Sequence, residues 1–318
     1  MNYLENNKEK KVSSRRKKLF KISLAVSSIL IIGAGIFAYS VYSNVKNTVN
    51  DRMYTPVKSI DRTPEQKEKA ERKEPLNILL MGVDEREYDR GRSDTLMVLS
   101  VNPNTDSMQI ISIPRDSRTE IVGRGFDDKI NHAYAFGGTD MAIATVENFA
   151  NIELDYYVKM NMEGLTDLVD AVGGITVNND IDWMDDSRDF HYKKGELELD
   201  GELAMGYVRM RYQDPNGDFG RNQRQRQVIE GIIDKGANIG SITKIDDVLA
   251  VLGDNMQTNM NFEDMKNIFK NYRDARKNTS NYQVTGNGTY IGDIYYLIVS
   301  EEERKKVHEM IVEFNEEV

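Results

Sequence analysis

Leu76-Asn-Ile-Leu-Leu-Met-Gly-Val83 and Thr95-Leu-Met-Val-Leu-Ser-Val101 are two short apolar runs separated by a charged loop. Runs of this length, rich in aliphatic residues, are typical of strands buried in the middle of a sheet. A third run, Met108-Gln-Ile-Ile-Ser-Ile113, follows after a turn at Asn102-Pro-Asn-Thr. The sequence therefore predicts three neighbouring strands that form the buried centre of a sheet.

Helical and strand patterns alternate after these runs. Helical spacing covers 140–150 and 162–171, and apolar strand patterns cover 156–160 and 175–177. Further helices are predicted at 200–209, 223–237, 245–252, 262–272 and 301–314, and a late strand at 282–284. Because helices alternate with strands, we expect an α/β/α sandwich, and residues 76–318 have the size of one large α/β domain.

The N-terminus has the pattern of a membrane anchor. The first 21 residues carry eight Lys or Arg against two Glu, and Ile22–Val41 contains no charged residue. About twenty apolar residues in a helix span a hydrocarbon core, and the basic flank predicts a cytoplasmic N-terminus. A cleaved signal peptide is the alternative, but its apolar region is shorter and no clear cleavage site follows. We expect a single-pass type II protein of the cell membrane, with a cytoplasmic tail (1–21), a transmembrane helix (22–43) and an external remainder.

The segment 44–75 is polar and mixed in charge, and it contains three of the six prolines of the chain. This composition is typical of a solvated spacer, and we interpret it as an extracellular stalk that precedes the domain 76–318. The chain has no cysteine. An exported domain without disulfides, as is common at the surface of Gram-positive bacteria, must owe its stability to a packed core.

One stretch is unusually rich in arginine. Arg209-Met-Arg-Tyr-Gln-Asp-Pro-Asn-Gly-Asp-Phe-Gly-Arg-Asn-Gln-Arg-Gln-Arg226 places five arginines and two aspartates in a chain of net charge −10. Guanidinium groups match phosphate oxygens two at a time and stay charged, so the cluster indicates a diphosphate site, although solvated surface pairs are the alternative. Gly217 and Gly220 bracket the loop, and a helix starting near Arg221 would point its N-terminal amides at the same anion. Nucleic acid is not expected as a partner, because a broad basic face is absent.

Further polar groups stand where the first three strands begin or end. Asp84 closes the first strand and Asp94 leads into the second, on either side of a loop rich in Gly and Arg. This is the pattern of a hard-cation site that shares its ion with phosphate oxygens. Arg115 and Arg118 follow the third strand. His132 is far in sequence from the other two histidines, so no histidine metal triad is indicated.

These blocks together resemble the LytR-CpsA-Psr (LCP) family. The matching residues are Gly82-Val-Asp-Glu, Gly91-Arg-Ser-Asp-Thr-Leu-Met, Ser112-Ile-Pro-Arg-Asp, Asp128-Lys-Ile-Asn-His-Ala-Tyr, Val169-Asp-Ala-Val-Gly-Gly-Ile, and Tyr207-Val-Arg-Met-Arg through Arg226-Gln. The resemblance runs from about residue 76 to residue 236, and a helix after a short basic tail is also the architecture of the family. It implies a single LCP-type α/β/α sandwich domain with a central mixed sheet, after one N-terminal transmembrane helix.

The resemblance also implies a reaction. Members of the family move a phosphate-linked glycopolymer, such as wall teichoic acid or capsule, from undecaprenyl diphosphate to the 6-hydroxyl of N-acetylmuramic acid in peptidoglycan. The implied cofactor is Mg²⁺, with Mn²⁺ as a substitute. The implied partners are the undecaprenyl-diphosphate-linked glycopolymer, peptidoglycan and the membrane. The sequence of Arg209-Met-Arg211 and of Gly217-Asp-Phe-Gly-Arg221 favours wall teichoic acid as the polymer.

Site residues are carried over from the family by position. The metal ligands fall on Asp84 and Asp94, and the catalytic set on Asp94, Arg115, Arg209 and Arg211. The diphosphate-binding positions are Arg92, Arg115, Arg118, Lys129, Arg209, Arg211, Arg221 and Gln225, with Asn131 and Arg224 in support. The attacking hydroxyl also needs a proton acceptor, and the sequence leaves Asp94, Asp116 and Asp214 open for that role.

Two other functions fit the same residues. A prenyl-diphosphate hydrolase would use water in place of the sugar hydroxyl with an identical site. A non-catalytic surface protein that binds prenyl diphosphates would need the arginines but not the two aspartates. We expect transfer as the main activity, with slow hydrolysis when the acceptor is missing.

Overall fold

The computed structural model describes residues 36–37, 39–60, 68–85, 91–238, 248, 252–253 and 255–317. Its centre is a sheet made of β1 (Leu76–Val83), β2 (Ser93–Asn102), β3 (Ser107–Ser112), β6 (Tyr156–Asn161), β11 (Met256–Thr258) and β12 (Asn278–Gln283). The strand order is β11-β6-β1-β2-β3-β12. The pairs β1/β6 and β3/β12 are parallel, whereas β1/β2, β2/β3 and β6/β11 are antiparallel. The predicted α/β class with a central mixed sheet is confirmed.

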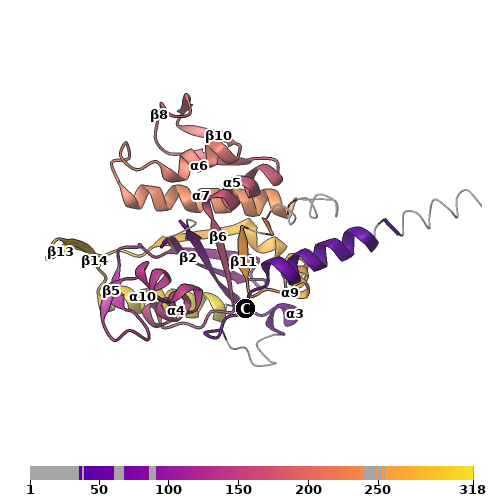
Figure 1. Cartoon of the computed structure of the whole chain (residues 1–318), viewed down its shortest axis with the longest axis horizontal. Coiled ribbons are helices and arrows are strands. Elements are labelled where there is room, and N and C mark those ends of the chain that lie inside the picture. Colours follow the sequence, from indigo (N-terminus) through magenta and orange to yellow (C-terminus); the bar gives the residue numbers. More distant parts are fainter. Residues whose placement is uncertain are drawn as a thin grey trace, which may run out of the picture.

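Helices cover both faces of this sheet (Figure 1). The named helices are α3 (Lys69–Arg72), α4 (His132–Ala150), α5 (Met162–Ala171), α6 (Gly201–Arg209), α7 (Asp218–Ala237), α9 (Phe262–Asn271) and α10 (Glu301–Glu316), with a π-helical turn η1 (Val49–Met53) and a 3₁₀ turn η2 (Arg273–Lys277). Of these, α6 packs on α5 and α7 and not on the sheet. Four two-stranded ribbons complete the fold: β4 (Arg118–Glu120) with β5 (Asp127–Lys129), β7 (Ile175–Asn179) with β10 (Gly195–Leu199), β8 (Trp183–Asp185) with β9 (Phe190–Tyr192), and β13 (Asn287–Ile291) with β14 (Ile294–Ile298).

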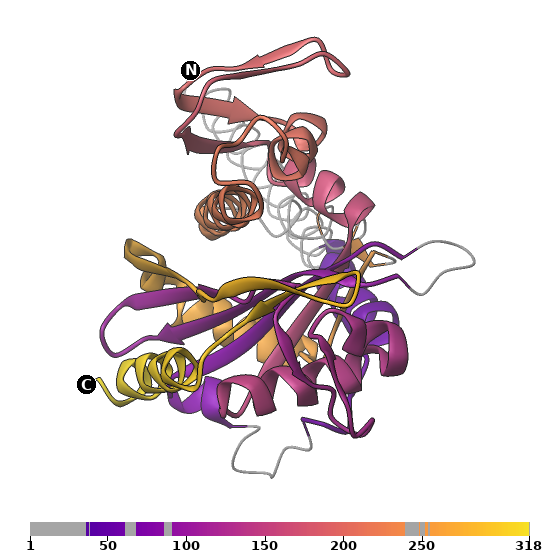
Figure 2. The same ribbon diagram turned by 90° about the vertical axis from the view of Figure 1, so that its left-hand side faces the viewer.

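Alternation along the central strands divides the core into two layers. Leu79, Met81 and Val83 of β1 belong to the cluster that includes α4 and α10, whereas Ile78 and Leu80 belong to the cluster on the opposite face. Successive strand residues point to opposite faces, so an apolar run without polar interruption requires cover on both sides. Viewed along the sheet, α4 and α10 lie below it and α7 lies above it (Figure 2).

The direction of the strands brings the predicted site residues to one edge of the sheet. Because β2 is antiparallel to both β1 and β3, the end of β1, the start of β2 and the end of β3 meet at the same edge. Asp84, Asp94 and Arg115 stand at these three positions. The hypothesis of a site built from strand ends therefore has the necessary topology.

Several predicted elements differ in detail. The helix expected at 140–150 begins at His132, and the helix expected at 223–237 begins at Asp218. The strand expected at 175–177 is present as β7, but it pairs with β10 outside the central sheet. Its side chains alternate between buried and exposed, which fits a ribbon with one packed face. Most of the helix expected at 245–252 lies outside the described residues.

Most of the predicted transmembrane segment 22–43 also lies outside the described residues. In the part that the structure describes, residues 39–48 are helical. No helix in the described ranges is both long and apolar enough to cross a bilayer.

The interpretation of 44–75 as a solvated spacer is wrong for part of that segment. Val49 and Met53 are fully buried and pack with Leu252, and Val57 joins the main core. The backbone N–H of Thr55 donates to Thr258 O at 2.7 Å, so the segment adds to the edge of the sheet beside β11. Val41, Val45, Val49 and Met53 recur every four residues along the helical stretch and are all buried, an apolar stripe that the charged neighbours obscured.

We predict that Met53→Asp detaches this segment from the domain, because a carboxylate at a fully buried apolar position is strongly unfavourable. Limited trypsinolysis of the full chain should then cleave between residues 49 and 60 at least about tenfold faster, which corresponds to about 1.4 kcal/mol of local stability. Tyr54→Asp, at a neighbouring exposed side chain, is the matched control and should leave the cleavage rate near that of the wild type. Equal rates for the two variants would contradict the docked segment.

Candidate active site

A glycine brings the two predicted metal-binding carboxylates together. Gly91 has a φ of +72°, and a Cβ atom there would lie 2.0 Å from the carbonyl oxygen of Asp84. The Asp84 N–H donates to Arg92 O at 3.2 Å, which closes the loop between β1 and β2. Only a residue without a side chain fits this approach. Asp84 and Asp94 therefore stand at the two ends of a loop that is pinched at its base.

Asp94 is held by two donors. Its Oδ1 lies 3.0 Å from Arg115 Nη1 and accepts from Asn131 Nδ2 at 3.3 Å. Burial lowers the pKa of Arg115, but the charge and hydrogen bond of Asp94, with Asp218 and Asp116, outweigh it and raise that pKa. Asn131 Oδ1 is buried without a hydrogen-bond partner among the described residues. The pair thus fixes Arg115 at the sheet edge in its charged form.

Arg224 organises the loop between α6 and α7. Its guanidinium donates from Nε to Tyr207 O at 3.0 Å and from Nη2 to Met210 O at 2.6 Å, and Nη1 pairs with Asp214. Both side chains of the ion pair are almost completely buried, and a Cβ at Gly220 would overlap the Asp214 carboxylate. Arg224 is therefore a structural residue that sets the path of the loop.

Arg226 is likewise internal. It is buried, and its Nη1 donates to Ser112 Oγ at 2.8 Å. The interpretation of all five arginines as one polyanion site is therefore wrong for Arg224 and Arg226. The reason is that they point from α7 into the protein.

The N-terminus of α7 presents guanidinium groups whose donors are only partly used. Arg221 Nη2 lies 2.7 Å from Asp218 Oδ1, and Arg211 Nε lies 3.7 Å from the same oxygen. The Nε and Nη2 atoms of Arg221 and the Nε of Arg115 are buried without hydrogen-bond geometry to any described residue. Burial, together with nearby Arg115 and Arg211, lowers the pKa of Arg221. Asp218 opposes this shift but does not outweigh it, and a bound anion would offset the cost of burying the guanidinium group.

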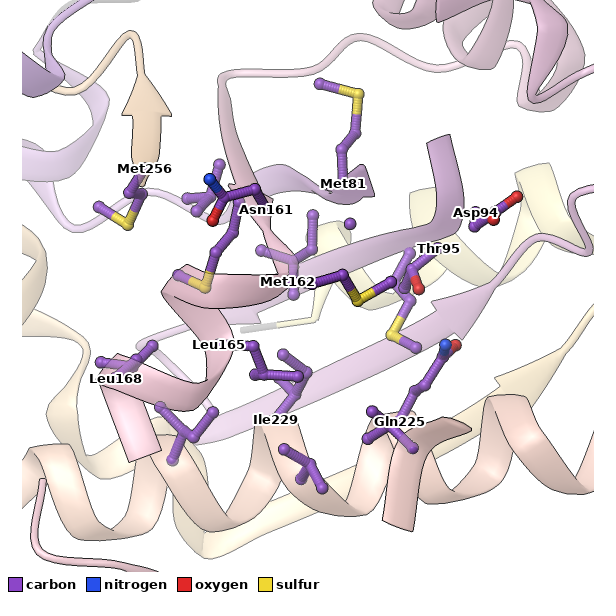
Figure 3. A pocket seen from close by; sticks show the side chains of 18 of the residues that line it. Met81, Asp94, Thr95, Asn161, Met162, Leu165, Leu168, Gln225, Ile229 and Met256 are labelled. Carbon is purple, nitrogen blue, oxygen red and sulfur yellow. The ribbon is translucent and has the colours of Figure 1, made fainter. Parts of the chain in front are cut away.

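A cavity of about 610 Å³ opens beside these arginines, between the central sheet and helices α5 and α7. Its polar lining residues include Asp84, Asp94, Arg209, Arg221 and Gln225. Its apolar walls are formed by Leu80, Met81, Met97, Leu99, Val158, Met160, Met162, Leu165, Leu168, Val208, Val228, Ile229, Ile232, Ile233 and Met256. Asp94 and Gln225 lie at one end of the cavity, and Leu168 and Met256 lie at the other (Figure 3). The cavity thus has a charged mouth and an apolar interior.

Five of the predicted site residues line this cavity, namely Asp84, Asp94, Arg209, Arg221 and Gln225. Arg115 does not line it but forms an ion pair with Asp94, which does. Arg92 is exposed at the base of the pinched loop. Lys129 Nζ lies 2.6 Å from Asp116 Oδ1, and Arg118 Nη1 lies 2.7 Å from Asp127 Oδ2. Lys129 and Arg118 thus have carboxylate partners and do not line the cavity, and their predicted contact with a diphosphate stays a prediction.

Two further polar side chains, Asn161 and His132, lie near the site. Asn161 ends β6, caps α5 by accepting from Gly164 N, and lines the cavity, yet sequence reasoning missed it. The strand-end rule, applied to 156–161, would have found it. His132 Nδ1 lies 2.7 Å from Asp128 Oδ2. Burial works to raise the pKa of Asp128, but the hydrogen bond with His132 leads the effects that lower it.

The sequence profile of the LytR_cpsA_psr family matches residues 38–312. The chain belongs to this family, and the resemblance found in the sequence is confirmed. This chain is 49% identical over 285 residues to the polyisoprenyl-teichoic acid–peptidoglycan teichoic acid transferase TagU of a Bacillus cereus strain. The alignment covers 89% of this chain and 93% of that protein.

Solved structures of related proteins have the same fold. The crystal structure of TagU from B. subtilis is 45% identical, with a TM-score of 0.66 over 77% of this chain and 99% of that one. A structure of TagT bound to LI-WTA is 26% identical, with a TM-score of 0.66 over 81% of this chain and 95% of that one. The fold is therefore shared with proteins named for the transfer of teichoic acid.

We predict that Asp214→Ala lowers the free energy of unfolding by about 3–5 kcal/mol, because it leaves the buried Arg224 guanidinium without its partner. Urea denaturation followed by circular dichroism measures this change. Asp234→Ala is the control, since Asp234 is exposed in its ion pair with Arg276, and it should unfold at nearly the urea concentration of the wild type. A small effect of Asp214→Ala would show that Arg224 does not depend on this pair.

Proposed function

We propose that this protein transfers a phosphate-linked glycopolymer from undecaprenyl diphosphate to the 6-hydroxyl of N-acetylmuramic acid in peptidoglycan. Wall teichoic acid is the polymer that we infer, in keeping with the names of the relatives. The observation that carries the proposal is that Arg115 Nε and Arg221 Nε and Nη2 are buried without hydrogen-bond geometry to a described residue, although both guanidinium groups have aspartate neighbours, beside an apolar cavity. A diphosphate attached to a long hydrocarbon has the matching chemistry at both ends.

The cavity fixes the orientation of the donor substrate. The prenyl chain lies between the sheet and α5 and α7, where its burial removes hydrocarbon from water. The diphosphate then meets Arg209, Arg221 and Gln225, and Arg115 approaches it from beside Asp94. The glycopolymer extends outward from the mouth.

The reaction is a substitution at the phosphorus that carries the glycopolymer. The muramic acid 6-oxygen forms a new P–O bond, and the P–O bond to the bridging oxygen breaks. Undecaprenyl phosphate leaves with the bonding electron pair, and the hydroxyl proton passes to a carboxylate. Charge that accumulates on the phosphoryl oxygens is met by the positioned guanidinium groups of Arg115 and Arg221, which is the main source of catalysis in phosphoryl transfer.

The geometry narrows the choice of proton acceptor. Asp214 is buried against Arg224 and does not line the cavity, so it is removed from the three candidates. Asp94 lines the cavity, and its hydrogen bond and its ion pair both fall on Oδ1. Asp116 stands behind Arg115, where Lys129 holds it. The proton acceptor is therefore Asp94 or Asp116.

The donor set fits a magnesium ion. Asp84 and Asp94 offer carboxylate oxygens at the polar end of the cavity, and Asn131 Oδ1, which accepts from no described residue, adjoins Asp94. No group of three or more His, Asp or Glu side chains is placed for a metal in the described parts of the chain. Two carboxylates with substrate oxygens are a normal Mg²⁺ environment. Bound magnesium would neutralise charge on the diphosphate, and Mn²⁺ can replace it.

The proposal places the domain outside the cell, anchored by the apolar segment 22–43 with its basic N-terminal flank on the cytoplasmic side. A lipid-linked donor and a wall acceptor are both accessible there. The docked segment 49–57 packs beside Met160, Leu168 and Met256, which line the apolar end of the cavity, so the proposed anchor and the prenyl chain lie at the same end of the fold.

We predict that Arg221→Ala lowers kcat/KM by about 10²–10³, because it removes a buried charge from the developing phosphoryl charge. The assay uses the full chain in detergent, a short-chain prenyl-diphosphate disaccharide, magnesium and uncrosslinked peptidoglycan oligomers, with mass spectrometry of the acceptor. Arg188→Ala is the control, since Arg188 forms its ion pairs in the β8–β9 region. A phosphodisaccharide on muramic acid supports the transferase. Sugar phosphate released at a rate unaffected by acceptor would instead establish a hydrolase, and unchanged donor a binding protein.

Metal dependence provides a separate prediction. Chelation should abolish transfer, and added Mg²⁺ should restore it. Asp84→Ala should raise the Mg²⁺ concentration for half-maximal rate at least about tenfold, because one of two carboxylate ligands is lost. Asp182→Ala, an exposed carboxylate paired with His191, serves as control. Full activity of the Asp84 variant at unchanged Mg²⁺ concentration would exclude this carboxylate as a ligand.

A further inference from the structure

The β13–β14 hairpin presents an unusual pair of exposed tyrosines. Tyr290 and Tyr295 are direct cross-strand partners, with 71% and 38% of their surfaces exposed. Their ring centroids are 5.6 Å apart in an edge-to-face arrangement. Ile291 and Ile294 form the next cross-strand pair and, one residue further along each strand, point to the opposite face. The hairpin therefore has a tyrosine face and an isoleucine face.

The hairpin is attached directly to the candidate active site. The Leu297 N–H donates to Asp116 O at 2.9 Å, and Leu297 forms a bridge with Ser117. Tyr296 donates its hydroxyl to Asp128 Oδ1 at 3.2 Å, and Lys129 Nζ lies 5.9 Å from the centre of the Tyr296 ring. The base of the hairpin is thus fixed to the residues that follow Arg115.

Tyr295 also lies within electrostatic range of carboxylates of the candidate active site. A Cβ at Gly288 would lie 2.6 Å from the Tyr295 hydroxyl, so the glycine lets this ring fold back along the hairpin. Burial raises the pKa of Tyr295, and the carboxylates of Asp116 and Asp218 raise it further. Asp218 is the partner of Arg221, and Asp116 is the neighbour of Arg115. Tyr295 is two residues before Leu297, whose backbone N–H binds Asp116 O, so the tyrosine pair lies next to the segment that carries Arg115.

We propose that Tyr290 and Tyr295 form a binding subsite for the glycan strand of the peptidoglycan acceptor. The inference rests on the proposed transferase function and assigns the side from which the acceptor approaches. The electron-rich face of an aromatic ring attracts the weakly positive C–H groups on the face of a sugar ring, and a tyrosine loses little conformational entropy in holding this geometry.

A glycan acceptor is favoured over a membrane surface by the position of the hairpin. The β13–β14 hairpin lies at one end of the molecule, and the helical residues 39–48, which lead from the predicted membrane anchor, lie at the other (Figure 1). The apolar end of the cavity near Met256 packs against this N-terminal segment. The lipid-linked donor and the hairpin are thus on opposite sides of the diphosphate position, which leaves the hairpin side open to the acceptor.

The test compares the two faces of the hairpin in the full chain. Tyr290→Ala combined with Tyr295→Ala should raise the KM for peptidoglycan oligomers about tenfold or more, because two stacking contacts are lost. The kcat at saturating acceptor and the KM for the prenyl-diphosphate donor should stay near the wild-type values. The conservative pair Tyr290→Phe and Tyr295→Phe should restore most of the acceptor affinity. Ile291→Ala combined with Ile294→Ala, on the opposite face, is the matched control.

Direct titration of the protein with a peptidoglycan tetrasaccharide, observed by calorimetry, separates this inference from the proposed function. Weaker binding in the tyrosine variant and unchanged binding in the isoleucine variant support the subsite even where no transfer occurs. Equal binding by both variants and the wild type overturns it. Loss of binding to vesicles that contain anionic lipid, with unchanged acceptor KM, would assign the hairpin to the membrane and likewise overturn it.

Discussion

The guanidinium of Arg224 is buried inside the loop between α6 and α7, where it binds Asp214 and the carbonyl oxygens of Tyr207 and Met210. A buried charge is tolerated only with partners on all sides, and these partners all belong to the 207–214 stretch. The loop is therefore wrapped around a cation on α7. That arrangement places Arg209 and Arg221 at the cavity mouth, and the rest of the site depends on it.

The remaining charges of the site follow from the direction of the strands. An antiparallel β2 between β1 and β3 brings two aspartates and Arg115 to one edge, where Asp94 and Arg115 hold each other. The α7 N-terminus approaches this edge with Arg221, whose donors are only partly used by the described residues. Opposite charges are thus present in the same small volume, but the guanidinium groups remain under-satisfied. A bound anion would supply the hydrogen-bond acceptors that these guanidinium groups lack.

The N-terminal segment and the β13–β14 hairpin lie at opposite ends of the molecule. Val49 and Met53 dock the N-terminal segment next to the apolar end of the cavity, and the β13–β14 hairpin is fixed behind Arg115 at the other end. The cavity passes between the sheet and α5 and α7 on the same axis. A donor with its hydrocarbon toward the anchor and its polymer outward would cross the fold in this direction. A cavity with one charged end and one apolar end would match the diphosphate and the hydrocarbon of such a donor.

The sequence by itself determined the fold class and the family, and five of the site residues that it predicts line one cavity of the structure. The runs at 76–83 and 95–101 are apolar on both faces, as strands of a sheet covered on both sides are, and Asp84 follows the first run whereas Asp94 precedes the second. Only the tertiary structure decided which arginines face a ligand and which face the core. Arg221 and Arg224 are three residues apart on one helix, yet one reaches the cavity mouth and the other is enclosed by a loop. The burial of Met53, the ribbon pairing of β7 and the position of Tyr295 were decided in the same way. The physical reason is that local spacing sets only the direction in which a side chain leaves the backbone. The groups that it meets belong to segments far away in the chain, and only packing brings those segments near.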